Sequence, residues 1–190
     1  MKNIKHIIVF VFATLLIVSC SNDDSNPLID DGVQNLSKLE FTTTGTFQNG
    51  DFVIVDNPEN SSDRATGVIG DNVAVVTFAD DSQGFTFMIM FPASKGTHQI
   101  TEESVAHIQY NGNAIPVPEF FFGSLGGSVT ISELEYANAP GSGGQAQIVT
   151  RAKGTFNANL MGYRFGDDSE HTQNISGNFD LYSYSTFDSE

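Results

Sequence analysis

Two carboxylates at alternate positions of one predicted strand are the side chains whose spacing most directly suggests catalysis. Glu133 and Glu135 lie in the β-rich run 128–136, and side chains two apart on a strand share one face. Carboxylates about 5 to 10 Å apart are what a glycoside hydrolase needs. Val129 and Ile131 have the same parity, however, so the pattern also describes a buried strand whose end emerges into solvent. We expect the solvated strand end, with a glycan hydrolase using Glu133 and Glu135 as the alternative.

Other catalytic signatures are missing from the sequence. It has no Gly-x-Ser-x-Gly elbow and no His-Glu-x-x-His, and His98, His107 and His171 are widely spaced. An acidic stretch could offer oxygen ligands to Ca²⁺, although it matches no EF-hand loop; its residues are Asp167, Asp168 and Glu170. We expect no cofactor, with calcium at these three residues as the alternative.

A predicted hairpin over residues 72–91 is apolar on both of its faces. One face of its second strand carries Phe and Ile, while Met88 and Met90 lie on the other. A sheet with one face in solvent should alternate between apolar and polar residues, so both faces should be covered. Residues 114–125 could form a cap over one of them. Alternatively, that face lines a pocket for an apolar small molecule beside Met88 and Met90, because methionine adapts to a ligand.

Three consecutive aromatic residues form a second candidate ligand surface. Phe120, Phe121 and Phe122 follow the stiff, extended segment 116–118. They could fill one end of the core or form an exposed apolar patch. Together with Met88 and Met90 they are the residues that we expect to face a ligand, if there is one.

The N-terminal residues have the proportions of an export signal. Lys2 and Lys5 precede an apolar run from Ile7 to Val18. As a helix this run would span about 18 Å, which is short for a bilayer core of about 30 Å. It therefore predicts a removable signal peptide over residues 1–19. Cys20 follows, and it is the only cysteine of the chain, so it has no intrachain disulfide partner.

The run that ends at Leu16-Ile17-Val18-Ser19-Cys20 resembles the lipobox of bacterial lipoproteins. The resemblance implies that Cys20 is acylated on its sulfur, becomes the N-terminus and is acylated again, which would anchor the chain stably. The next residues resemble the acidic export tag of Bacteroidota-type lipoproteins, which implies display on the exterior face of the outer membrane; they are Ser21, Asn22, Asp23 and Asp24. We expect residues 20–36 to form a flexible, lipidated tether. Alternatively, residues 21–24 are only part of this tether, and the anchor faces the periplasm.

The charge balance limits the partners of the protein. The chain has 8 Lys and Arg and 23 Asp and Glu, a formal net charge of −15, and loss of Lys2 and Lys5 with the signal would make it −17. Such a field repels nucleic acid and anionic lipid. We expect membrane contact only through the lipid anchor, and a glycan or a protein as partner.

From Leu39 onward the sequence predicts strand after strand, with turn signals about ten residues apart. We expect an all-β domain over residues 37–190, an antiparallel β-sandwich, with a lipocalin-like β-barrel as second choice. Three segments share Gly-x-Phe and predict kinked strands in which Gly bends the chain and Phe enters the core; they are Gly45-Thr46-Phe47, Gly154-Thr155-Phe156 and Gly177-Asn178-Phe179.

The last third of the chain carries a further resemblance. Residues 127–132, 152–156 and 175–180 resemble the C-terminal half of small, uncharacterised β-rich lipoproteins of Bacteroidota-type bacteria. That group has no activity to transfer. The function we expect is therefore a non-enzymatic binding or structural module, lipid-anchored at the cell surface, with an unidentified ligand.

Overall fold

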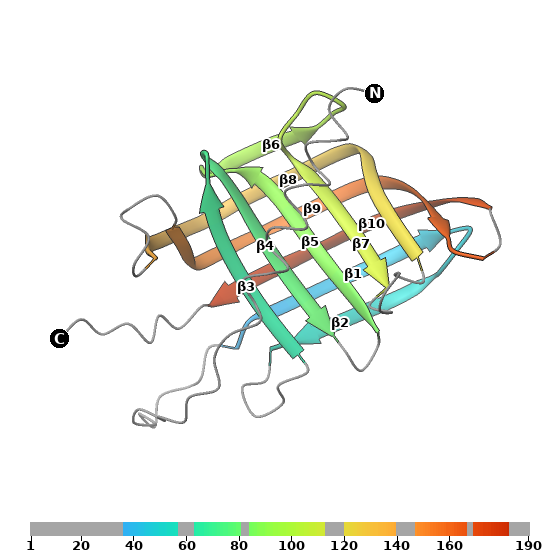
Figure 1. Cartoon of the computed structure of the whole chain (residues 1–190), viewed down its shortest axis with the longest axis horizontal. Helices are drawn as coiled ribbons and strands as arrows, with labels where there is room; N and C mark the ends of the chain where they lie inside the picture. The colour runs from blue at the N-terminus through green and yellow to red at the C-terminus, as the bar shows by residue number, and fades with distance from the viewer. Residues whose placement is uncertain are drawn as a thin grey trace. The chain divides into compact units, whose positions relative to one another are not determined.

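The computed structural model describes residues 36–56, 63–80, 84–112, 120–139, 147–166 and 169–182, which contain strands and no helix (Figure 1). These residues are rich in Val, Ile, Thr and Phe, which favour strands. The strands are β1 (Lys38–Gly45), β2 (Gly50–Val55), β3 (Asp63–Gly70), β4 (Val73–Asp80), β5 (Phe85–Pro92), β6 (Gly96–Ile100), β7 (His107–Gly112), β8 (Phe120–Asn138), β9 (Gln147–Arg164) and β10 (Glu170–Tyr182). The all-β prediction is confirmed.

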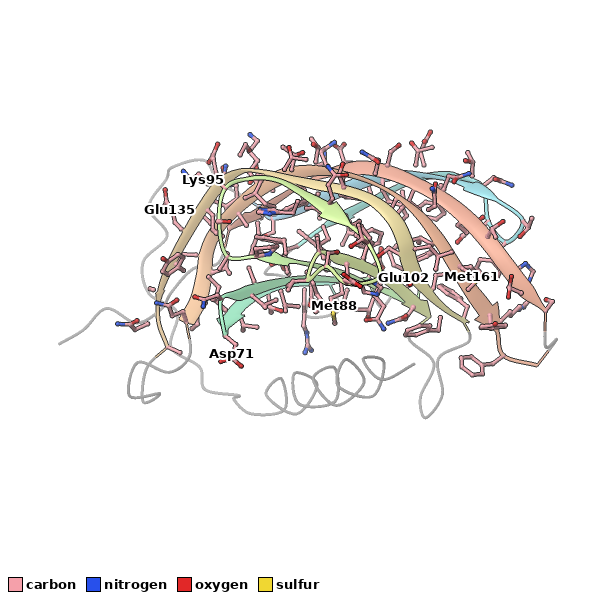
Figure 2. The ribbon with its side chains drawn as sticks, turned by 90° about the horizontal axis from the view of Figure 1, so that it is seen from above. Asp71, Met88, Lys95, Glu102, Glu135 and Met161 are labelled. Atoms are coloured by element: carbon pink, nitrogen blue, oxygen red, sulfur yellow. The ribbon has the colours of Figure 1, made fainter. Side chains whose placement is uncertain are left out.

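The strands are arranged as two antiparallel layers that join at two corners. The large sheet has the order β6-β8-β9-β10-β1-β2, and the small sheet has the order β3-β4-β5-β7. β3 pairs with the first residues of β9, and β7 pairs with the first residues of β8. Hydrogen-bonded neighbours therefore form a closed ring, and the molecule is a sandwich with the connectivity of a flattened barrel. Figure 2 shows the large sheet arching over the small one.

Aromatic side chains from both layers form the centre of the core. The Phe41 ring of the large sheet lies 4.9 Å from Phe87 of the small sheet, and Phe87 lies 5.2 Å from Phe156. Tyr110 is buried among them, and its hydroxyl donates a hydrogen bond of 2.8 Å to Gln48 Oε1. That bond satisfies the one polar atom of the ring, as buried tyrosines require.

The Gly-x-Phe segments place glycine opposite phenylalanine on neighbouring strands. Gly177 pairs with Phe156, and Gly154 pairs with Phe179. A Cβ at Gly177 would lie 2.8 Å from Phe156 Cζ, and a Cβ at Gly154 would lie 2.9 Å from Phe179 Cε1. The burial of Phe156 and Phe179 in the core is as expected. These two glycines also make room for the facing ring, and bending of the strand at them remains a prediction.

Candidate binding surfaces

The side of the small sheet that faces away from the core is here called the outer face. Strand register determines which residues lie on it. Met88 pairs with Thr77 and Gln109, and Met90 pairs with Val75 and His107. The alternate residues of these strands, among them Phe87 and Ile89, belong to the core. Figure 2 shows Met88 on the side of the small sheet that faces away from the arch.

Several outer-face side chains are buried without belonging to the core. Val75 is 5% exposed, Met88 is 7% exposed and Gln109 is 3% exposed, and none of the three is in the core cluster. Both faces of the β4–β5 hairpin are thus covered, as the apolar pattern predicted. The expected cap is wrong for residues 120–125, which instead form the start of β8 beside β7. Residues 114–119 lie outside the described residues.

Two carbonyl oxygens on the outer face lack a donor within the described part of the chain. They are Gln109 Oε1 and Asn111 Oδ1, and both atoms are buried. An unsatisfied buried acceptor costs about 1–3 kcal/mol. The apolar pocket beside Met88 and Met90 remains a prediction.

His107 is fixed at the corner where β7 meets β8. Its Nδ1 lies 2.9 Å from Ser124 Oγ, and that oxygen also accepts the N–H of Ile108 at 2.9 Å. Burial lowers the pKa of His107, so the ring is neutral at pH 7. Its Nδ1 can then accept a hydrogen bond from the Ser124 hydroxyl. No local pattern in the sequence links His107 to Ser124, because they are 17 positions apart and only the strand pairing brings them together.

The three consecutive phenylalanines are divided by strand alternation. Phe120 and Phe122 are buried in the core, where both rings pack against Phe47. Phe121 is 39% exposed on the opposite side. The trio therefore both fills the core and supplies an exposed ring, so each of the two expectations holds for part of it.

Phe121 belongs to a row of outward-facing side chains that crosses four strands. It pairs with Asn111 of β7 on one side and with Tyr163 of β9 on the other, and Tyr163 pairs in turn with Glu170 of β10. Tyr163 is 48% exposed, and its hydroxyl donates a 3.3 Å hydrogen bond to Glu170 Oε2. We call these four residues the aromatic row. It presents two rings flanked by an amide and a carboxylate, across about 14 Å at the usual strand spacing.

No protein-family model, curated protein or solved structure matches the chain.

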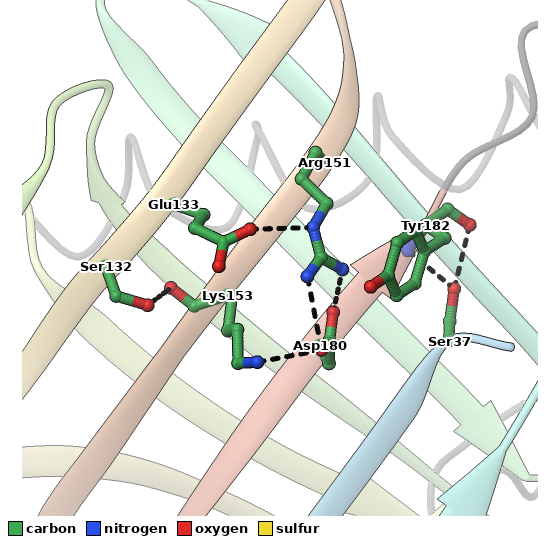
Figure 3. A network of polar contacts seen from close by, with 7 residues as sticks. All are labelled: Ser37, Ser132, Glu133, Arg151, Lys153, Asp180 and Tyr182. Atoms are coloured by element: carbon green, nitrogen blue, oxygen red, sulfur yellow. Dashed lines mark hydrogen bonds and ion pairs between the residues drawn. The ribbon is translucent and has the colours of Figure 1, made fainter. Parts of the chain in front are cut away.

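The two candidate catalytic carboxylates lie on the solvent side of the large sheet. A bulge between Ile131 and Glu133 shifts the register, so Leu134, and not Glu133, follows Ile131 into the core. Glu133 Oε2 accepts a 3.0 Å hydrogen bond from Arg151 Nε. Figure 3 shows that Arg151 also bonds to Asp180.

Arg151 connects three strands of the large sheet. Its guanidinium carbon lies 3.6 Å from the centre of the Tyr182 ring, a cation–π contact, and Lys153 Nζ lies 3.5 Å from Asp180 Oδ2. Glu133 is thus one end of an ionic network that runs across β8, β9 and β10. Glu135 is exposed beside this network.

Of the predicted calcium ligands, Asp167 and Asp168 lie outside the described residues. Glu170 is exposed and takes part in the aromatic row. Within the ranges the structure describes, no group of three His, Cys, Asp or Glu side chains could hold a metal ion. Calcium at Asp167, Asp168 and Glu170 remains a prediction.

The lipidation residue Cys20 and the export-tag residues Ser21, Asn22, Asp23 and Asp24 also lie outside the described residues. In the described segments, no helix is long and apolar enough to cross a membrane. The lipid anchor therefore remains a prediction from the sequence.

Proposed function

We propose that the chain is a non-enzymatic binding module, anchored at the exterior of the outer membrane through lipid on Cys20, that binds its ligand on the aromatic row. The observation that carries this proposal is the exposed pair Phe121 and Tyr163, which occupy directly opposite positions of β8 and β9. A cross-strand aromatic pair stabilises a sheet by only about 0.2–1 kcal/mol, so stability gives a small reason for placing both rings in solvent. Exposed rings of this kind are typical of ligand contacts.

The position of the row suits recognition. β8 and β9 are the longest of the described strands and are paired along most of their length, and the two rings lie where β8 begins and β9 ends. Sites built on strands hold their geometry better than sites built on loops. A tether of about 15 residues after Cys20 would give the domain a reach of roughly 20 Å from the membrane.

The hydrolase alternative has less support. Glu133 is engaged with Arg151 in a network that ties three strands together, which is a sufficient structural reason for its presence. The proposal therefore assigns no catalytic role to Glu133 or Glu135.

The test compares two matched tyrosines of the large sheet. Tyr163 at the end of β9 and Tyr136 near the end of β8 have similar exposure, but only Tyr163 lies in the aromatic row. The lipidated chain in nanodiscs is applied to an array of immobilised glycans and to an array of extracellular proteins. We expect binding on at least one array that Tyr163→Ala abolishes and Tyr136→Ala preserves.

Binding that both variants retain, or no binding on either array, would contradict the proposal. Release of shortened sugars from a bound glycan would contradict the non-enzymatic assignment and favour the hydrolase.

A further inference from the structure

We infer that the ligand of the aromatic row is an uncharged oligosaccharide, bound with its sugar rings over Phe121 and Tyr163 and its hydroxyls donating to Glu170. This inference rests on the proposed function and specifies the ligand class of the same site.

Two adjacent rings beside a carboxylate fit a sugar, which has an apolar face and a polar edge. A pyranose ring has an apolar C–H face, which packs against an aromatic ring, and hydroxyl groups at its edge, which need acceptors. Phe121 and Tyr163 offer faces at adjacent strand positions, and Glu170 offers carboxylate oxygens at the end of the row. Hydrogen bonds from hydroxyls to a carboxylate are short and strong because the acceptor is charged.

The hydrogen bond within the row joins one ring to the carboxylate. Tyr163 Oη donates to Glu170 Oε2 at 3.3 Å, an interaction that uses only one of the two carboxylate oxygens. The second oxygen is therefore available to a hydroxyl of the ligand.

The charge of the chain selects among sugars. Its net charge is −15, and the row itself contains Glu170 and no basic residue. A uronate or sulfated glycan would be repelled both by the whole molecule and by the site. A neutral oligosaccharide meets no such barrier, and its affinity should not depend on ionic strength.

The small extent of the apolar surface favours a sugar over a protein. A stable protein interface buries about 1,200–2,000 Å² with a contiguous apolar centre. The row has two exposed rings, and each is bordered by a polar residue, Asn111 or Glu170. This footprint is suited to a short chain of sugar rings.

The experiment uses the lipidated chain in nanodiscs and a glycan array that carries neutral oligosaccharides and uronate oligosaccharides of equal length. We expect at least one neutral oligosaccharide to bind and the uronates to be rejected. For that neutral oligosaccharide, calorimetry should give affinities about tenfold weaker for Phe121→Ala and for Tyr163→Ala, the value of one lost ring contact. Glu170→Gln should weaken binding about fivefold. Tyr136→Ala should bind as the wild type does, at low and at high salt.

Three results would overturn the inference. One is the absence of any bound neutral oligosaccharide, and another is neutral binding that Phe121→Ala and Tyr163→Ala leave unchanged. The third is binding only to extracellular proteins, with loss in Tyr163→Ala; it would keep the proposed function and remove the sugar as its ligand. If Tyr163→Ala weakens the binding of no probe, both the proposed function and the inference about the sugar fail.

Discussion

A single imidazole at the corner of the small sheet links burial to the acid sensitivity of the fold. His107 is held by Ser124 at 2.9 Å, and burial lowers the pKa of its ring. In the unfolded chain the pKa returns to about 6.5. Below that value the unfolded state binds the proton more readily, so protonation favours unfolding. The contribution of neutral His107 to stability is complete above about pH 6.5 and is lost as the pH falls toward the folded pKa.

We therefore predict that His107→Gln reduces the loss of stability on acidification. Urea unfolding of the wild type and the variant, at neutral pH and at about one unit below pH 6.5, gives the difference. The wild type should lose more unfolding free energy over this interval than the variant does. His98→Gln is the control, because His98 bonds to Ser94 on a different part of the surface. Equal losses for the wild type and His107→Gln would contradict the prediction.

Phe121 and His107 show how much of a site can be predicted from sequence. The exposure of Phe121 between two buried neighbours follows from alternation along a strand, which the sequence contains. The pairing of Phe121 with Tyr163, and of His107 with Ser124, depends on which strands become neighbours and in what register. That information is absent from local patterns, so the aromatic row could be assembled only from the structure.

At the scale of strands, glycine and phenylalanine act as one unit across β1, β9 and β10. Gly177 pairs with both Phe41 and Phe156, so two rings close over a position without a side chain. A Cβ at Gly177 would clash with the backbone oxygen of Glu40. A side chain there must displace a neighbouring strand, because the backbone cannot turn aside as a flexible side chain would.

Gly177→Ala is predicted to lower the unfolding free energy by about 1–3 kcal/mol, the usual cost of overpacking. Gly126→Ala is the matched control in β8, since the nearest atom to its built Cβ is Ile100 O at 4.0 Å. This control should stay within about 0.5 kcal/mol of the wild type. Chemical denaturation of the three proteins measures both values. Similar stability for Gly177→Ala and the wild type would show that the strands adjust at no cost.

Two strand features differ in how well the sequence predicts them. The β4–β5 hairpin was predicted with both faces covered, because its apolar residues occupy both parities. The bulge after Ile131 was not predicted, and it reverses the parity on which Glu133 and Glu135 were placed. A bulge depends on the match between two strands, here β8 and β9, so the sequence of β8 alone does not contain it.

At the scale of the whole molecule, the two layers carry different surface chemistry. The solvent side of the large sheet carries the Arg151 network, with Glu133, Asp180 and Lys153. The outer face of the small sheet carries Val75, Met88 and Met90 and the amide side chain of Gln109. The network pairs two basic with two acidic side chains, whereas most of the named outer-face residues are buried. The aromatic row lies at one end of the β8–β9 pair, so the orientation of the domain relative to a membrane would affect how a ligand reaches the row.

That orientation depends on the lipid anchor predicted at Cys20, which can be tested in cells. If Cys20 carries lipid and residues 21–24 direct export, protease added to intact cells should remove the wild-type protein from a blot. Cys20→Ala should release the protein from the membrane fraction, because two or more acyl chains are what hold such an anchor stably. Replacement of Asp23 and Asp24 by Ala should leave the protein bound to the membrane but protect it from the protease.

A periplasmic marker that survives the treatment is the control for intact cells. A wild-type protein that is membrane-bound and protected would place the domain on the periplasmic face. The aromatic row would then meet only sugars of the cell's own envelope. A protein that stays in the membrane fraction after Cys20→Ala would exclude the lipid as its anchor, because the acyl chains would no longer explain how so acidic a domain remains at a membrane.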